Sequence, residues 1–215
     1  MKHFLLLLTL LGLSLLLPGC SAPADGKVKA VTAEAVAIPK ASTSTESEKL
    51  TLTAEGSKLE FIGAHIGSGI TGGEGGVFKK FSGTITLVNA KPENSQVTVE
   101  IEMNSVTTRS GGLAQHLKTA DFFDVAKYPK ATFISTEIKP GGEKGATHLV
   151  TGNLELHGAK KAITFPATIN VTSDAVTVQS EFTINRKDFG ITYDSKTIRD
   201  EVVLKLAVRA SRAKT

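Results

Sequence analysis

From about Lys49 onward, apolar and polar residues alternate one by one in segment after segment of the chain. In residues 96–104 (QVTVEIEMN), four apolar side chains alternate with polar ones. This period of two puts every second side chain on the same face of a strand, so each segment predicts a β-strand with one buried face. Strands are expected at 50–54, 58–66, 81–87, 96–104, 130–139, 150–156, 163–169, 176–184 and 201–209.

Only one stretch of this region predicts a helix. In residues 110–123 (SGGLAQHLKTADFF), Leu113, His116 and Leu117 stand at positions i, i+3 and i+4, and Ser110 with its glycines suits a helix start. The region at 49–215 is therefore expected to be a single all-β domain with one short helix.

A sheet of this kind has edges that must be protected. Closing it into an antiparallel eight-stranded β-barrel removes the edges and leaves an interior just wide enough for side chains or one ligand. A two-sheet sandwich satisfies the same alternation, and periodicity does not separate the two.

The first twenty residues differ in texture from the rest. Lys2 precedes an apolar run over 4–17, which is too short to span a bilayer as a helix and suits a secretory signal peptide. The run ends in Leu17-Pro18-Gly19-Cys20, which resembles the bacterial lipobox, and Cys20 is the only cysteine. We expect a lipoprotein signal peptide at 1–19 and acylation of Cys20, which fixes the protein to a membrane from the periplasmic side. Ser21, by resemblance to enterobacterial sorting, favours the outer membrane.

Residues 20–48 predict a flexible tether behind the acylated cysteine. They are rich in Ala, Ser, Thr, Lys and Glu and contain no aromatic residue, so they cannot bury enough apolar surface to offset the entropy of ordering. About 28 flexible residues have a root-mean-square reach of roughly 30 Å. A helix at 28–38 is the alternative for part of this segment.

Charge and composition argue against a nucleic-acid partner. Removal of residues 1–19 takes away Lys2 and no acid, which leaves 24 Lys and Arg against 21 Asp and Glu, about +3. These charges alternate along the chain, and with no Trp and two Tyr there is little to stack on bases. Nothing in the sequence indicates whether the chain is a monomer or an oligomer.

A glycine motif and the histidines are the candidates in this sequence for binding a nucleotide cofactor or a metal. Gly67-x-Gly69-x-x-Gly72 has the spacing of a dinucleotide-binding loop, but more glycine and another predicted strand follow instead of a helix. We interpret this stretch as a flexible loop between two strands. The domain's histidines lie on separate elements, and the carboxylates fall on polar strand faces. We therefore expect no metal, no cofactor and no enzyme activity.

Four segments carry a resemblance to a known family. They are Phe78-Lys79-Lys80-Phe81-Ser82-Gly83, the stretch from Gln115 through Asp121-Phe122-Phe123-Asp124 to Tyr128-Pro129 and Phe133, Gly152-x-Leu154-x-Leu156-His157-Gly158, and Phe182-x-Ile184-Asn185-Arg186-x-Asp188-Phe189-Gly190. In this order, over about residues 50–210, they resemble the signature of the YceI-like family. The glycine-rich insert at 67–76 departs from the family pattern.

The resemblance implies a lipocalin-like barrel whose apolar interior holds a polyisoprenoid, such as an isoprenoid quinone, or a similar long amphiphile, for transport, storage or sequestration. Strand parity then gives the side chains expected to contact the ligand. They are Phe61, Phe81, Ile85, Leu87, Val99, Ile101, Met103, Leu113, His116, Leu117, Phe133, Leu154, Phe165, Phe182, Leu204 and Leu206.

Other interpretations stay open. The barrel could be the scaffold of an envelope stress or interaction module, or the site of an enzyme on isoprenoid substrates that uses His116, Arg186 or Asp188. The helix either packs on the sheet, with His116 bound to a local carboxylate, or forms a lid that brings His116 and Arg109 to the polar end of a ligand. Arg186 and Asp188 are expected to form an ion pair at a strand end.

Overall fold

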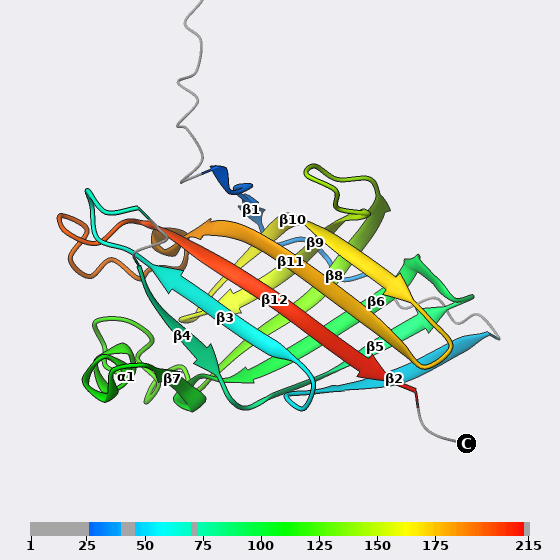
Figure 1. The fold of residues 1–215 in the computed structure, drawn as a ribbon, viewed down its shortest axis with the longest axis horizontal. Helices are drawn as coiled ribbons and strands as arrows, with labels where there is room; N and C mark the ends of the chain where they lie inside the picture. Colours follow the sequence, from blue (N-terminus) through cyan, green and yellow to red (C-terminus); the bar gives the residue numbers. More distant parts are fainter. Residues whose placement is uncertain (1–25, 40–45, 70–72, 213–215) are drawn as a thin grey trace, which may run out of the picture.

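The protein is an antiparallel β-barrel with additional strands at one end (Figure 1). The computed structural model describes residues 26–39, 46–69 and 73–212. The strands of the barrel wall are β2 (Ser47–Thr53), β5 (Phe81–Val88), β6 (Lys91–Glu102), β8 (Lys130–Pro140), β9 (His148–Leu156), β10 (Ala159–Val171), β11 (Ala175–Asn185) and β12 (Glu201–Ser211). The other elements are β1 (Val31–Glu34), β3 (Lys58–Gly63), β4 (Glu74–Phe78), β7 (Val106–Thr108), the helix α1 (Gly111–Leu117) and the 3₁₀ helices η3 (Met103–Ser105) and η4 (Arg186–Phe189).

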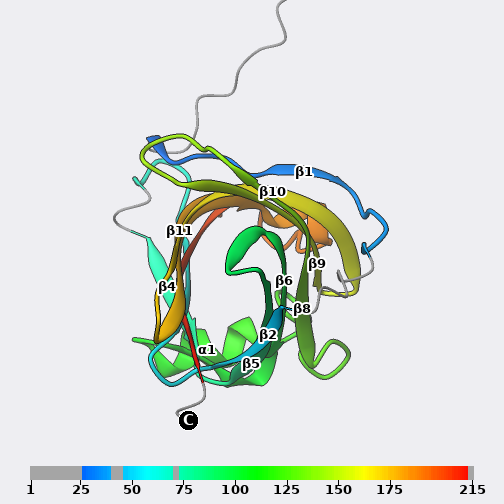
Figure 2. The same ribbon diagram turned by 90° about the vertical axis from the view of Figure 1, so that its right-hand side faces the viewer.

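The eight wall strands pair in a closed ring. The order runs β10, β9, β8, β6, β5, β2, β12 and β11, and β11 pairs with β10 again. All of these pairs are antiparallel. Figure 2 looks into this ring from one end. The predicted eight-stranded barrel is confirmed, and the two-sheet sandwich is excluded.

Strand register puts the alternating apolar residues on the inside of the ring. Val99 stands opposite Phe133, and Phe133 stands opposite Leu154 on the next strand. Directly paired residues share a face of the sheet, so this row of side chains faces the same way. Phe133 therefore points inward.

Three short strands prolong the wall at one end of the barrel. After β2 the chain turns over residues 54–57 and continues as β3, which pairs with β12 on one side and with β4 on the other. The prediction of a glycine loop over 67–76 was wrong at its end, because Gly75 and Gly76 belong to β4. A Cβ on Gly76 would lie 2.5 Å from the Phe61 ring, so glycine lets this ring lie flat against the neighbouring strand.

The helix is shorter than its sequence predicted. It covers only residues 111–117, with Ser110 as N-cap accepting a hydrogen bond from the Leu113 amide at 3.4 Å. The rest of the expected helix, residues 118–123, forms turns instead, and these turns continue to residue 127. In the described part of the chain no helix combines the length and the apolar composition that crossing a bilayer requires.

The predicted flexible tether is also wrong where the structure describes it. Residues 27–39, which we call the N-terminal strap, lie along the outside of the barrel (Figure 2). Ala30 donates its N–H to Thr183 on β11 at 2.8 Å, and residues 31–34 pair with β10 as β1. Ala30 is 3% exposed and belongs to the apolar core. Residues 1–25 and 40–45 lie outside the described parts.

A proline explains why the strap has a place to dock. The β10–β11 ladder ends at the pair Thr168 and Gln179. Pro166 accepts a hydrogen bond from Ser180 on β11 through its carbonyl, and in a strand the N–H of the same residue points to the same neighbour. Proline has no N–H to donate. The two strands therefore separate beyond this point, and the strap inserts between them.

Asn153 on β9 holds the far half of the strap. Its side-chain amide donates to the carbonyl of Val36 at 2.7 Å and accepts from the Val36 N–H at 3.0 Å, and the residue is 5% exposed. Loss of both hydrogen bonds in Asn153→Ala is expected to reduce the free energy of unfolding by about 1–2 kcal/mol. Urea unfolding measures this loss, and amide exchange at Val36 should become faster.

The variant Asn153→Asp is the matched control for this prediction. Its carboxylate still accepts from the Val36 N–H but cannot donate to the carbonyl, so we expect an intermediate exchange rate. Unchanged exchange at Val36 in both variants would show that Asn153 does not hold the strap.

Candidate ligand-binding interior

The inside of the barrel is lined by two apolar clusters. The first contains Ala30, Ile138, Val150, Leu154, Ile163, Phe165, Ala167, Phe182, Ile184 and Phe189. The second contains Leu50, Leu52, Leu59, Phe81, Ile85, Leu87, Val176 and Ala210. Val97, Ile169 and Leu206 pack against both clusters. The two clusters therefore form one continuous apolar lining.

Aromatic rings dominate the first cluster. Phe165 and Phe182 stack with ring centroids 4.3 Å apart, and Phe133 lies 5.7 Å from Phe165. Phe182 is 1% exposed. Buried rings in such contacts contribute both area burial and specific geometry, so this half of the barrel is firmly packed.

Space remains beside these packed residues. Val99, Leu204 and Leu206 face inward yet are only half-buried. Phe133 lies flat on the wall because Gly152 leaves room for it: a Cβ there would be 2.4 Å from the ring. The ring is closed, and these side chains point into it and still have accessible surface. They therefore border a lumen. A chain of methylene groups is the kind of ligand that such a lining suits.

Most of the side chains predicted to contact a ligand lie on this inner surface. Those in or packed against the two clusters are Phe81, Ile85, Leu87, Val99, Ile101, Phe133, Leu154, Phe165, Phe182, Leu204 and Leu206. Phe61 on β3 lies opposite Leu204 on β12, and its ring contacts those of Phe78 and Phe123. The sequence prediction omitted Val97, Ile163, Ile169 and Ile184, although their alternation with polar neighbours was visible.

Besides Phe61, four predicted contact residues lie outside the two clusters. Met103 is in η3, and Leu113, His116 and Leu117 are on α1, which packs beside β7 near one end of the barrel (Figure 1). Parity could not place them, since the strand pattern stops at Glu102.

His116 is held by neighbours on the loops at this end. Its Nε2 lies 2.8 Å from the Asp121 carboxylate, and its ring meets those of Phe122 and Tyr193 edge-on at 5.1 and 5.3 Å. The local carboxylate expected from the sequence is thus present. Because Tyr193 belongs to the loop between η4 and β12, this contact joins two loops that are distant in the sequence.

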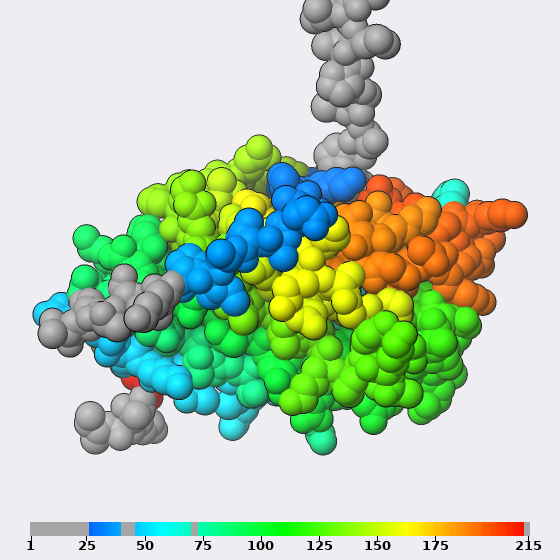
Figure 3. Space-filling model, turned by 180° about the vertical axis from the view of Figure 1, so that it is seen from behind, coloured from blue at the N-terminus to red at the C-terminus, as the bar shows by residue number. Residues whose placement is uncertain are grey.

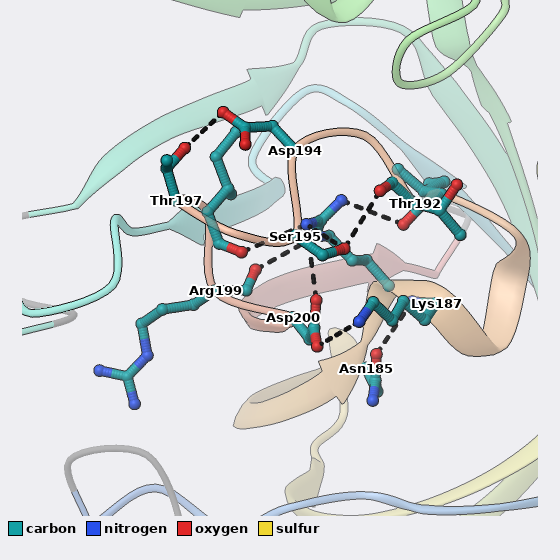
Figure 4. A network of polar contacts seen from close by, with 11 residues as sticks. Asn185, Lys187, Thr192, Asp194, Ser195, Thr197, Arg199 and Asp200 are labelled. Carbon is teal, nitrogen blue, oxygen red and sulfur yellow. Dashed lines mark hydrogen bonds and ion pairs between the residues drawn. The ribbon is translucent and has the colours of Figure 1, made fainter.

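A buried arginine organises the loop that carries Tyr193. Figure 4 shows polar contacts of this loop, with Ser195, Arg199 and Asp200 among the labelled residues. Arg186 is 4% exposed. Its guanidinium donates to the carbonyl oxygens of Arg199 (3.1 Å), Ile191 (3.1 Å) and Ile198 (3.3 Å), the Ser195 hydroxyl (3.3 Å) and the Asp200 carboxylate (3.5 Å). The expected ion pair with Asp188 was wrong, and the partner is Asp200. Asp188 follows within the same 3₁₀ turn, whereas Asp200 lies where the loop returns to the barrel.

A hollow lies on the outside of the wall where β10 and β11 separate. It has a volume of about 500 Å³ and is bordered by the strap, by Pro166 and by Leu206. Glu181 at its rim pairs with Lys27 at 2.6 Å and with Lys205 at 3.6 Å.

The ion pair between Glu181 and Lys27 depends on pH in a defined direction. The hydrogen bond from Lys27 lowers the pKa of Glu181 below its ordinary value. The carboxylate therefore favours the folded strap at neutral pH, and this contribution is lost as the pH falls through the lowered pKa.

Within residues 26–39, 46–69 and 73–212, no three His, Cys, Asp or Glu side chains gather as a metal-binding group.

A closed eight-stranded antiparallel barrel with an apolar lining is a small β-barrel whose interior has room for side chains or for one small ligand. The YceI-like domain family matches residues 50–210. The chain therefore belongs to the YceI-like family.

Relatives and solved structures agree with this family. A UPF0312 protein of Pseudomonas putida (strain W619) is 41% identical over 122 residues, which is 54% of this chain and 62% of the relative. BcnA of Burkholderia cenocepacia is similar in structure, with a TM-score of 0.65 and 26% identity over 74% of this chain and 99% of BcnA. A polyisoprenoid binding domain from Saccharophagus degradans, implicated in plant cell wall breakdown, has a TM-score of 0.60 at 18% identity, over 77% of this chain and 100% of the domain. This last likeness shows the fold alone.

Proposed function

We propose that the protein is an exported, lipid-anchored binding protein that holds a polyisoprenoid or a similar long amphiphile inside its barrel. The observation that carries the proposal is the continuous apolar lining with accessible inward side chains such as Val99 and Leu206. The name of the Saccharophagus degradans domain supports the same class of ligand.

The energetics of such a ligand fit an apolar lumen. Each buried methylene contributes roughly 0.8 kcal/mol before the costs of association and ordering. Several isoprene units would therefore give micromolar or tighter binding without a specific polar contact. Transport, storage and sequestration all require only this reversible burial.

The membrane anchor is a separate part of the proposal. Cys20 lies outside the described residues, and the argument for its acylation is the sequence Leu17-Pro18-Gly19-Cys20 at the end of an apolar run. Two or three acyl chains hold a protein stably on a membrane, where a single chain is marginal. The proposed location is the periplasm, on the outer membrane.

Native mass spectrometry of the full chain, extracted in mild detergent, tests both parts. We expect one prenyl-chain lipid per protein, identified after organic extraction, and an acylated peptide that begins at Cys20. A barrel that stays empty after incubation with prenyl quinones, with an intact circular dichroism spectrum, would favour a scaffold role. A free Cys20 thiol would contradict the anchor alone.

A further inference from the structure

The docked strap fixes the place where the chain leaves the barrel. The strap starts at Lys27 beside the hollow between β10 and β11. Only the five residues 21–25 stand between the expected acylated Cys20 and Gly26. An extended chain advances about 3.3–3.6 Å per residue, so this distance is at most about 20 Å. The face of the barrel that carries the strap therefore stays close to any membrane that holds Cys20.

Exposed apolar side chains gather on the same face. Val31 is 67% exposed, Val36 46% and Ile38 47%, and all three belong to the strap. Leu149 on β9 is 38% exposed and pairs with Pro166 on β10. The strand β1 of the strap pairs with this same strand β10. Figure 3 shows the strap, in blue, lying across the surface of the barrel. The described chain has only two other large apolar residues as exposed as these, Ile66 and Tyr193.

Charges on this face are largely paired. Lys27 pairs with Glu181 at 2.6 Å and Lys161 with Glu34 at 2.6 Å. Paired charges attract an anionic surface weakly, so attraction to lipid must come mainly from the apolar side chains. Apolar side chains that sit at the boundary between headgroups and acyl chains bind membranes in this way.

The separation of β10 and β11 lies on this face as well. The hollow there is bordered by outward-facing Glu181 and Lys205 and by Leu206, which packs against both inner clusters. Contact between this face and a bilayer would therefore bring lipid to the break in the β10–β11 ladder, where the strap lies between the two strands.

We propose that the strap face docks on the lipid bilayer, with Val31, Val36 and Ile38 at the membrane interface and the β10–β11 separation turned toward the lipid. The bound amphiphile then exchanges between bilayer and lumen on this side of the barrel. The docking rests on the lipid anchor of the proposed function, and the direction of exchange rests on its ligand.

Lipid quenching of a site-specific probe tests the docking. Full-length lipoprotein carrying Ile38→Cys labelled with bimane is reconstituted into vesicles of phosphatidylethanolamine and phosphatidylglycerol that contain doxyl-labelled phospholipid. Cys20 is the only native cysteine, and its acylation leaves the probe as the single label. The matched control is Ile66→Cys, which is 58% exposed and follows β3 outside the strap. We expect several-fold stronger quenching at position 38, and equal weak quenching at both positions would overturn the docking.

The triple variant Val31→Ser, Val36→Ser, Ile38→Ser tests exchange. It should bind a fluorescent prenyl lipid in detergent as the native chain does, but take it up from vesicles several-fold more slowly, whereas Ile66→Ser should keep the native rate. Equal uptake rates in all three proteins would overturn exchange through this face. Absence of lipid binding in detergent by the native chain would instead contradict the proposed function and leave the quenching result standing. If envelope proteins, but not vesicles, shield the probe at position 38 from solvent, the face binds a protein partner. That result would overturn the bilayer proposal.

Discussion

Arg186→Ala is expected to lower the free energy of unfolding by about 3–5 kcal/mol, because it removes a buried charge from several partners at once. Arg186 is 4% exposed, and its guanidinium donates to three carbonyl oxygens, a hydroxyl and the Asp200 carboxylate. Alanine leaves these acceptors without a donor in a site that water reaches poorly. Urea unfolding followed by circular dichroism measures the loss.

Two further variants make this prediction specific. Arg186→Lys keeps the charge but has no planar fork of donors, so it should recover only a small part of the stability. Lys187→Ala removes the neighbouring cation, which pairs with the same Asp200 at 2.8 Å but is 41% exposed, and should cost no more than about 1 kcal/mol. If Arg186→Ala unfolds at the same urea concentration as Lys187→Ala, the buried network does not stabilise the fold as the geometry indicates.

The second large effect concerns ligand binding. Val99→Trp places a large ring at an inward position of β6 that still has accessible surface. The ring should occupy space equal to two or three methylenes of the ligand. At roughly 0.8 kcal/mol for each methylene, the loss is about 2 kcal/mol, or roughly 30-fold in the dissociation constant. Titration with a fluorescent prenyl lipid measures this change.

The adjacent residue supplies the control for the lumen variant. Thr98→Trp puts the same ring on the outward face of the same strand, since successive side chains alternate, and should leave affinity unchanged. Both variants should unfold with a single cooperative transition. Native affinity in a folded Val99→Trp protein would mean that the ligand does not occupy the lumen beside β6.

Much of the barrel could be predicted from local sequence. Alternation over 96–104 and 201–209 identified β6 and β12 and the face of each that is buried, because a strand repeats every two residues regardless of its partners. The inward positions of Val99, Phe182 and Leu204 followed from the same rule. Residues outside the regular strands were not predictable in this way, which is why Met103 and His116 were placed with the lining.

The prediction of a flexible tether failed for a reason of a different kind. Nothing within residues 27–39 shows that this segment is ordered, because its composition buries little apolar surface by itself. The site that receives it is created by Pro166, more than a hundred residues later, which ends one ladder and leaves donors and acceptors on β11 for Ala30. Only the assembled sheet brings these two parts together.

The sequence by itself determined the eight wall strands and β3, the faces they bury and the family, because each depends on local periodicity or on motifs within single segments. The tertiary structure decided the closure of the ring, the pairing of Arg186 with Asp200 in place of Asp188, and the docking of the strap. Each of these depends on which distant backbone donors and acceptors meet, and that is fixed only when the strands have paired.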